Sequence, residues 1–156
     1  MESFFDKVCM VLVGTTHPGN IGAAARAMKA MNQKNLRLVN PLHFPSAEAS
    51  ARAAGADDIL ASCKQFSSLE EAIKDCDLVI GTSARIRGIP WPMILPRECA
   101  KKIFEKNYSS IAIIFGRESS GLSNEELQLC NLVLKIPTNS EYASLNLAAA
   151  VQIICY

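Results

Sequence analysis

Short apolar runs alternate with helix-like segments along almost the whole chain, and this alternation restricts the fold more than any other feature. The first run, Val8–Val13, is apolar at every position, which is typical of a strand covered on both faces. Four further runs follow the same pattern: Leu36–Val39, Leu78–Gly81, Ile111–Phe115 and Leu132–Ile136. Helical periodicity lies between them, at residues 20–32, 46–54, 67–75, 97–107, 123–130 and 144–155. We therefore predict an α/β fold, a parallel sheet with helices on both faces.

Local signals refine this outline. Two of the helices are expected to begin with a capping box, Ser67 with Glu70 and Ser123 with Glu126. Residues 56–66 are ambiguous, with a short strand near Lys64–Phe66 as one reading. The stretch Ser83–Pro96 contains three prolines, which disfavour both a helix and a central strand. A loop of that length in a compact domain is usually functional.

Length and composition exclude several classes of protein. A chain of 156 residues fits one compact domain, and its apolar stretches fall short of the roughly 18–20 residues that a membrane helix needs. We therefore expect no membrane association and a cytoplasmic location. The six cysteines are scattered without a C-x-x-C pair, which argues against a disulfide framework and against a zinc site. No metal is expected.

The charge balance offers no global argument for a nucleic-acid partner. Sixteen Lys and Arg residues face fifteen Asp and Glu residues, so the formal net charge is +1. Binding of RNA must then rest on a local cluster. Candidates are basic residues on and after the proline-rich stretch: Arg85, Arg87, Arg97, Lys101 and Lys102.

Ligands of parallel α/β sheets bind outside the carboxyl ends of the strands. Five loops are expected at that edge: Gly14–Asn20, Asn40–Pro45, Thr82–Pro96, Gly116–Gly121 and Pro137–Ala143. Two of them have the glycine spacing of a P-loop but lack its lysine, and no strand is followed by G-x-G-x-x-G. Nucleoside triphosphates and dinucleotides are therefore weak candidates. A G-x-S-x-G nucleophile motif is also absent, so hydrolase chemistry has little support.

Several polar residues at this edge have both a structural and a functional interpretation. Arg117 and Glu118 directly follow an apolar strand, where they either cap the sheet or face a ligand, and the strand-end position favours the ligand. Residues 137–146 offer hydroxyl and amide groups suited to an adenine edge or a ribose, although a helix cap explains them equally. Asn20 and Arg26 are six residues apart, so the start of their helix decides whether both face one site.

Three sequence blocks, read together, resemble the SpoU-type branch of the SPOUT RNA methyltransferases. The blocks are Pro18–Arg26, Phe115–Leu127, and Ile136-Pro137 with Ser144-Leu145-Asn146. Further stretches look like the bacterial tRNA branch that methylates the 2′-hydroxyl at position 32 of the anticodon loop: Gly81–Arg85, Pro90–Pro92 and Pro96–Cys99.

This resemblance implies S-adenosyl-L-methionine as the methyl donor, a deep trefoil knot in the C-terminal part of the sheet, and a homodimer whose active site takes residues from both chains. The residues implied to bind the cofactor are Thr82, Ser83, Ala84, Gly116, Ile136, Ala143, Ser144 and Leu145. The residues implied to line the reacting ribose are Arg26, Glu118, Ser144 and Asn146, with Asn20 supporting them.

The acceptor RNA is left open by these motifs. A tRNA substrate is the leading interpretation, with ribosomal RNA as the alternative within the same chemistry. A non-catalytic nucleotide- or RNA-binding module is the alternative from another class. We expect residues 1–156 to form a single catalytic domain without the C-terminal extension that helps relatives to grip tRNA. Its binding of tRNA should then be weak and strongly dependent on salt.

Overall fold

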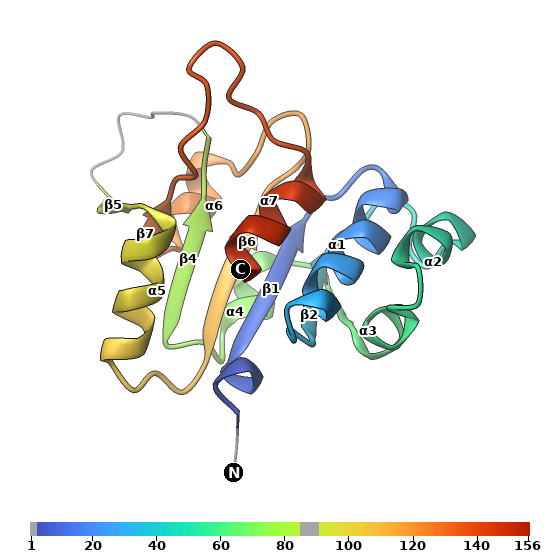
Figure 1. The fold of residues 1–156 in the computed structure, drawn as a ribbon, viewed down its shortest axis with the longest axis horizontal. Coiled ribbons are helices and arrows are strands. Elements are labelled where there is room, and N and C mark those ends of the chain that lie inside the picture. Colours follow the sequence, from blue (N-terminus) through green and yellow to red (C-terminus); the bar gives the residue numbers. More distant parts are fainter. Residues whose placement is uncertain (1–2, 85–90) are drawn as a thin grey trace.

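A single twisted sheet forms the centre of the protein in the computed structural model, which describes residues 3–84 and 91–156. Within these residues the sheet has seven strands in the order β3-β2-β1-β6-β4-β7-β5, and every neighbouring pair is parallel (Figure 1). The strands are β1 (Val8–Val13), β2 (Asn35–Val39), β3 (Lys64–Phe66), β4 (Leu78–Thr82), β5 (Met93–Ile94), β6 (Ile111–Phe115) and β7 (Leu132–Leu134). The predicted α/β class with a parallel sheet is confirmed.

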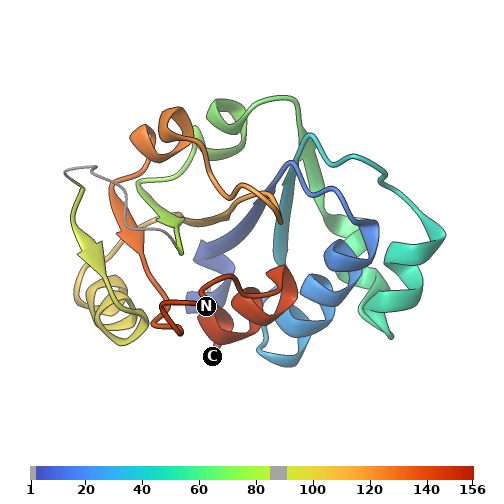
Figure 2. The ribbon, with the colours of Figure 1, turned by 90° about the horizontal axis from the view of Figure 1, so that it is seen from above.

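Helices cover both faces of this sheet, as predicted. They are α1 (Pro18–Ala30), α2 (Ala47–Ala53), α3 (Asp57–Ser62), α4 (Leu69–Ile73), α5 (Pro96–Glu105), α6 (Asn124–Gln128) and α7 (Leu147–Cys155), preceded by a 3₁₀ turn, η1 (Phe4–Lys7). Figure 2 shows α1, α5 and α7 on one side of the sheet and α4 and α6 on the other. Each face therefore has its own hydrophobic core.

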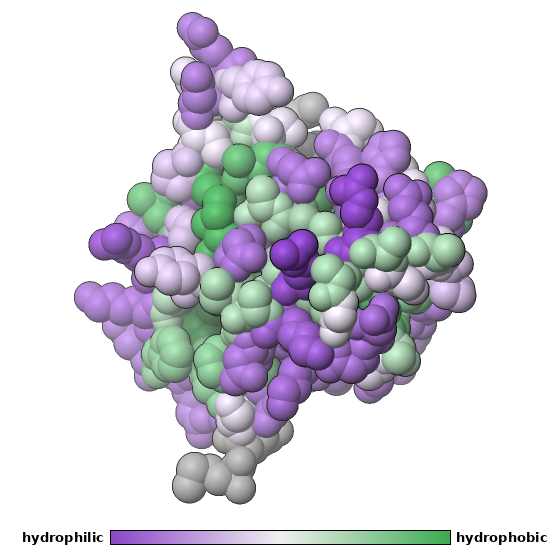
Figure 3. Space-filling view, turned by 45° about the vertical axis from the view of Figure 1, so that its right-hand side comes forward, coloured by the Kyte–Doolittle hydropathy of each residue, from purple (hydrophilic) through white to green (hydrophobic). Residues whose placement is uncertain are grey.

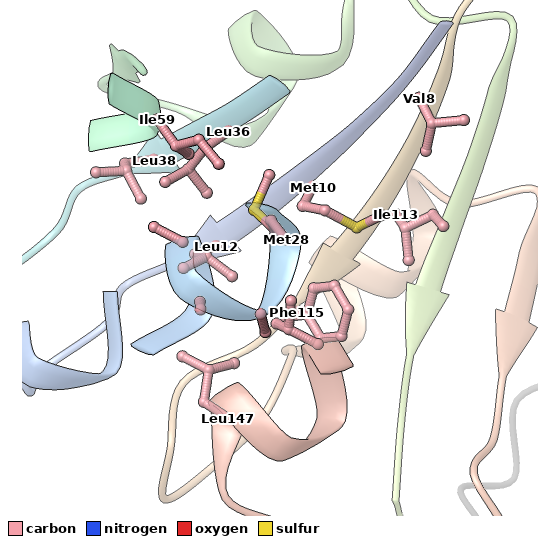
Figure 4. Close-up of a cluster of buried hydrophobic side chains, with 14 of the residues drawn as sticks. Val8, Met10, Leu12, Met28, Leu36, Leu38, Ile59, Ile113, Phe115 and Leu147 are labelled. Carbon is pink, nitrogen blue, oxygen red and sulfur yellow. The ribbon is translucent and has the colours of Figure 1, made fainter. Parts of the chain in front are cut away.

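Strand β1 contributes to both cores because all six of its residues are buried. Met10 and Leu12 point toward α1 and α7, where they join Phe115 and Leu147 in the larger core (Figure 4). Val11 faces the opposite core, beneath α4 and α6. Complete burial of an aliphatic side chain contributes about 1.5–3 kcal/mol, so this strand anchors the two layers to each other.

The predicted helices and strands differ from the structure mainly at their ends and in two short elements. Helix α3 occupies part of the ambiguous segment, and the strand suggested at Lys64–Phe66 is confirmed as β3. Strand β5 lies within the proline-rich stretch, where it forms the edge of the sheet beyond β7. An edge strand tolerates prolines because one of its sides needs no backbone donors.

One of the two expected capping boxes is wrong. The side chain of Ser68, not Ser67, caps α4 by accepting a hydrogen bond from the Glu71 amide at 3.2 Å. Strand β3 runs to Phe66, and the Ser67 carbonyl accepts a hydrogen bond from Asn40, so the helix begins one residue later. The box formed by Ser123 and Glu126 is confirmed.

The strand order fixes where the loops of interest lie. All strands point the same way, so their carboxyl ends meet at one edge, shown uppermost in Figure 1. The connection from β7 to α7 rises above this edge and projects as the uppermost part of the surface, with hydrophilic side chains at its tip (Figure 3). The trefoil knot implied by the family resemblance stays a prediction.

Candidate functional site

A cavity of about 320 Å³ opens at the carboxyl ends of β4, β6 and β7. Its walls come from the ends of these strands, from the loop of residues 116–121, and from the segment that leads into α7. The cavity falls within the usual size range of small-molecule sites, about 300–1,000 Å³. A ligand at this edge would contact segments that lie far apart in the sequence.

All eight residues implied to bind the cofactor line this one cavity: Thr82, Ser83, Ala84, Gly116, Ile136, Ala143, Ser144 and Leu145. The backbone holds several of them in place. The Thr82 hydroxyl donates to the Ile114 carbonyl at 2.8 Å, and the Ser83 amide donates to the Leu134 carbonyl at 3.0 Å. Their contact with a cofactor stays a prediction.

Gly116 is required where β6 ends and the loop turns back. A Cβ atom at this position would collide with the backbone of Gly121 and Leu122. The loop closes on itself through hydrogen bonds between Arg117 and Gly121, with the Gly121 amide donating to the Arg117 carbonyl at 2.9 Å. Gly121 has a positive φ of 68°, which glycine adopts without strain. A glycine at position 116 therefore lets the loop pack directly against the end of β6.

Glu118 ties this loop to the loop after β1. Its carboxylate accepts hydrogen bonds from the backbone amides of Thr16, at 3.0 Å, and His17, at 2.9 Å. It also accepts one from the Asn20 side-chain amide, at 3.0 Å. Two donors are the free amides just before α1, so the carboxylate also complements the positive end of that helix.

These donors hold Glu118 in its ionised form. Burial alone would raise the pKa of Glu118, but the hydrogen bonds from Thr16, Asn20 and His17 outweigh burial and lower the pKa to about 2. Near neutral pH the carboxylate is therefore a fixed negative charge that accepts hydrogen bonds. It is a poor proton acceptor, since a general base needs a pKa near the working pH.

Asn20 carries the connection from Glu118 to the last helix. Its side-chain oxygen lies 3.4 Å from the side-chain nitrogen of Asn146, which donates to it. The oxygen of Asn146 caps α7 by accepting a hydrogen bond from the Ala148 amide at 2.9 Å. A chain of hydrogen bonds thus links three of the predicted site residues, Glu118, Asn20 and Asn146. The structure confirms Asn146 as a helix cap, and its role at the reacting ribose stays a prediction.

Arg117 lines the cavity but is also used structurally. Its guanidinium pairs with Glu126 at 2.8 Å and 3.2 Å, and its side chain packs over Gly14. The ion pair with Glu126 raises the pKa of Arg117. The strand-end position predicted that Arg117 and Glu118 face a ligand. In the structure Arg117 lines the cavity, and its ion pair with Glu126 also stabilises the loop.

Arg26 is not brought to the cavity of its own chain. Helix α1 begins at Pro18, so Asn20 lies in its first turn, and Arg26 follows about 9 Å further along and roughly 240° around the helix. The arginine is exposed, whereas Asn20 turns toward Glu118 and Asn146. Ser144, by contrast, lines the cavity.

Sequence reasoning missed the backbone partners of Glu118 and most of the apolar wall. The amides of Thr16 and His17 leave no signal in the sequence because any residue type supplies them. The missed wall residues lie at the ends of β6 and β7, just before α6, and in α7, where they resemble ordinary core positions: Phe115, Leu122, Leu134, Leu147 and Ala150. Their role follows only from the way β6, β7 and α7 converge.

Only some residues of the predicted basic cluster lie in the part of the chain that the structure describes. Arg97, Lys101 and Lys102 lie on α5, beside the edge strand β5. Arg85, Arg87 and Pro90 lie outside the described residues. Over the ranges that are described, no three His, Cys, Asp or Glu side chains gather in a way that would hold a metal ion. None of the helices in those ranges has the length and apolar character needed to cross a lipid bilayer.

Comparison with known proteins places these features in a family context. The model of the SpoU rRNA Methylase family matches residues 7–156. The tRNA (cytidine/uridine-2′-O-)-methyltransferase TrmJ of Sodalis glossinidius is 55% identical over 151 residues, which cover 96% of this chain and 59% of that protein. The chain thus spans about three fifths of the length of this curated relative.

Solved structures agree with the sequence comparison. A probable methylase family protein from Haemophilus influenzae has a TM-score of 0.93 and 48% identity, covering 97% of this chain and 64% of that one. TrmJ from Z. mobilis has a TM-score of 0.91 and 37% identity, covering 95% of this chain and 66% of that one. The SpoU methyltransferase AviRb of Streptomyces viridochromogenes, solved with AdoMet, shares the fold at 20% identity, with a TM-score of 0.73.

Proposed function

The chain belongs to the SpoU rRNA Methylase family, and on that premise we propose that it transfers a methyl group from S-adenosylmethionine to a ribose 2′-hydroxyl of tRNA. The proposed acceptor is position 32 of the anticodon loop. The observation that carries the proposal is the cavity at the carboxyl edge, where the eight residues that the family resemblance implies for the cofactor meet beside Glu118. The proposed setting is the cytoplasm, with residues 1–156 acting as a catalytic domain.

The cavity fits the proposed cofactor in size and in chemistry. Leu134, Ile136 and Leu145 offer apolar contact to an adenine ring, while Thr82 and Ser83 offer polar groups at the carboxyl end of the neighbouring strand β4. Gly116 keeps the loop of residues 116–121 folded tightly at the end of β6, which sets the shape of this side of the cavity. When bound, S-adenosylmethionine would supply an electrophilic methyl group on its sulfonium.

Residues of the chain would hold the acceptor ribose rather than react covalently. Glu118, with a pKa of about 2, holds the loop after β1 and positions Asn20 and Asn146. Arg26 stays protonated, so its assigned role is to clamp a phosphate and stabilise the developing oxyanion. A phosphate oxygen or a water molecule then accepts the hydroxyl proton.

The exposed position of Arg26 supports a homodimer with composite sites. In its own chain the arginine lies along α1 from Asn20 and does not line the cavity. A second copy would present this arginine to the cavity of the first. The resemblance implies the same arrangement.

Methyl transfer to tRNA, followed by mapping of the modified nucleotide, tests the proposal. We expect a 2′-O-methylated nucleotide at position 32, loss of transfer in Arg26→Ala, and unchanged binding of S-adenosylhomocysteine in that variant. Arg26→Lys keeps the charge and loses the planar fork, so near-full turnover would contradict the clamp. Transfer to ribosomal RNA alone would favour the alternative substrate. Binding of RNA without transfer would favour the non-catalytic module.

A mixing experiment tests the composite site. Arg26→Ala keeps the cavity, and Leu145→Arg blocks the cavity while keeping Arg26. Mixed dimers of the two variants contain one complete site, so an equal mixture should recover about a quarter of the wild-type activity. A mixture as inactive as its two components, with mixed dimers present, would contradict the composite site.

A further inference from the structure

The segment between β7 and α7 carries an exposed aromatic residue beside the cavity. Tyr142 is 83% exposed, although the residue that follows it, Ala143, lines the cavity. Aromatic side chains contribute most where they are buried, in cores and in interfaces. Within the described ranges, the ring–ring contacts involve Phe4, Phe5 and Phe104. Packing within the described chain therefore does not account for an aromatic residue at position 142.

A tight turn over residues 139–142 holds the backbone of Tyr142. The Tyr142 amide donates to the Asn139 carbonyl at 3.1 Å, and the two residues form an antiparallel bridge. The side-chain oxygen of Asn139 accepts a hydrogen bond from the Glu141 amide at 2.9 Å, which is a common way for asparagine to close a turn. Because backbone groups and Asn139 make these bonds, the turn does not depend on the ring of Tyr142.

Both ends of this turn start from the wall of the cavity. Thr138 precedes the turn, Ala143 follows it, and both residues line the cavity. The turn therefore lies at the rim, in the segment that rises above the carboxyl ends of the strands in Figure 1. Ser144, which the resemblance places at the reacting ribose, is two residues from Tyr142, a Cα distance of at most about 7 Å. A polynucleotide with its ribose at Ser144 would thus bring a neighbouring base within reach of the ring.

The turn offers RNA an aromatic face and no positive charge. The charged residue of the turn is Glu141, which is exposed and would repel a phosphate group. A contact with the phosphate backbone is therefore disfavoured here, whereas the ring of Tyr142 is available to a base. Unpaired bases of RNA loops stack on aromatic side chains, whereas the bases of a duplex are already stacked on one another. A ring at this position therefore suits an unpaired nucleotide.

We propose that Tyr142 positions the substrate by stacking on an unpaired base of the acceptor RNA, next to the nucleotide that is methylated. This inference rests on the proposed function, since it takes the cavity as the site of methyl transfer. It adds that the acceptor ribose enters from a single-stranded segment. It also adds that stacking holds a flanking base without reading its identity, because every base has a π-face.

Binding of tRNA to the full chain at low salt, measured by filter retention, tests the contribution of the ring. Tyr142→Ala should bind about tenfold more weakly, as expected for the loss of one stacked base. Tyr142→Phe keeps the ring and should bind nearly as tightly as the wild type. Ser140→Ala is the matched control, since it shortens another exposed side chain of the same turn. Equal binding by Tyr142→Ala and Ser140→Ala, or no binding by the wild type, would overturn the inference.

Removal of single bases from the RNA tests the contact itself. The probe is a hairpin RNA with the sequence of a tRNA anticodon stem and loop, in which each loop nucleotide is made abasic in turn. At one position beside the acceptor nucleotide, loss of the base should weaken binding to the wild-type chain about tenfold. The same loss should leave binding to Tyr142→Ala almost unchanged, because its stacking partner is already absent. Losses that add to that of Tyr142→Ala at every position would overturn the inference.

Kinetics and oligomeric state separate this inference from the proposed function. In methyl transfer, Tyr142→Ala should raise the KM for tRNA about tenfold and leave kcat nearly unchanged, because stacking holds substrate and transition state alike. Transfer with an unchanged KM would overturn the stacking and keep the function. Ring-dependent binding without transfer would contradict the function and support the stacking. Conversion of Tyr142→Ala to a smaller species in sedimentation velocity would assign the ring to a contact between copies and overturn the inference.

Discussion

The two ends of the sheet hold a carboxylate in its ionised form by different means. At the carboxyl end, Glu118 accepts hydrogen bonds from neutral donors, the amides of Thr16 and His17 and the side chain of Asn20. At the amino end, Asp75 is paired with the guanidinium of Arg37. Both carboxyls have a pKa of about 2. Neutral donors leave the charge of Glu118 uncompensated beside the cavity, whereas the ion pair neutralises Asp75 and joins the end of α4 to β2.

The use of neutral donors at Glu118 and of an ion pair at Asp75 fits the positions of the two carboxylates. Glu118 lies at the cavity, whereas Asp75 connects two elements at the other end of the sheet. A site that must orient a ligand needs fixed polar groups that salt does not loosen. An ion pair with one exposed partner mainly fastens two elements together and weakens in salt.

The largest loss of stability is expected at Gly116, at the carboxyl ends of the strands, where two backbone segments pack directly against each other. Gly116→Ala places a Cβ against the backbone of Gly121 and Leu122, neither of which can move without opening the loop. We expect a loss of about 3 kcal/mol in the free energy of unfolding, measured by urea denaturation. Gly55→Ala is the control, since no atom lies within 4 Å of its Cβ and only the positive φ of 97° opposes the change. Equal losses in the two variants would contradict the account of the loop.

A somewhat smaller effect is expected at the carboxylate itself. Glu118→Ala leaves the donors of Thr16, His17 and Asn20 without their acceptor, and we expect a loss of about 2 kcal/mol. The loss should be similar in 50 mM and 500 mM sodium chloride because the donors are neutral. If salt removed most of the difference, charge rather than hydrogen bonding would be holding the loop.

Acid should weaken both ends in the same pH range. The pKa of Glu118 falls from an ordinary 4.5, and that of Asp75 from 3.8, to about 2 in the folded chain. A lowered pKa in the folded state stabilises the protein above the ordinary value, and this contribution is lost as the pH falls from about 4.5 to about 2. After allowance for solvent screening, each group should contribute about 1 kcal/mol. Unfolding free energies measured between pH 6 and pH 2.5 should show this decline, and Glu118→Gln should flatten it.

The smallest effect is expected at the amino end. Asp75→Asn removes the ion pair with Arg37 but keeps a hydrogen-bond acceptor, and the Asp75 side chain is 58% exposed. We expect a loss of about 0.5–1 kcal/mol that shrinks in 500 mM sodium chloride. Lys74→Ala, at the exposed pair with Glu71, is a control expected to change little. A salt-independent loss at Asp75 would remove the contrast between the two ends.

Sequence patterns predicted the central strands of the sheet better than the contacts between segments that lie far apart in the sequence. Val8–Val13 and Ile111–Phe115 have the predicted bounds because every residue in each is apolar and both faces of the sheet are covered. The cavity residues were predicted from the family resemblance and from strand ends, and the structure brings them together. Strand β5 was missed because two residues at a sheet edge carry no periodicity.

The surroundings of Arg26 and of Glu118 could not be predicted from the sequence, for different reasons. The facing of Arg26 depends on the residue at which α1 begins, and a start at Pro18 turns it away from Asn20. The partners of Glu118 are backbone amides from a loop about a hundred residues away, and backbone groups leave no mark on residue identity. Long-range contacts of this kind need the strand order, which the alternation of elements does not specify.

Calorimetric titration of the chain with S-adenosylhomocysteine tests the central claim, that the cavity at the carboxyl end is the cofactor site. We predict saturable binding to the wild-type chain and its loss in Leu145→Arg, which fills the cavity. Leu42→Arg, at a leucine that is 60% exposed and does not line the cavity, should bind as the wild type does. No binding to the wild-type chain, or equal binding in both variants, would contradict the assignment of this cavity.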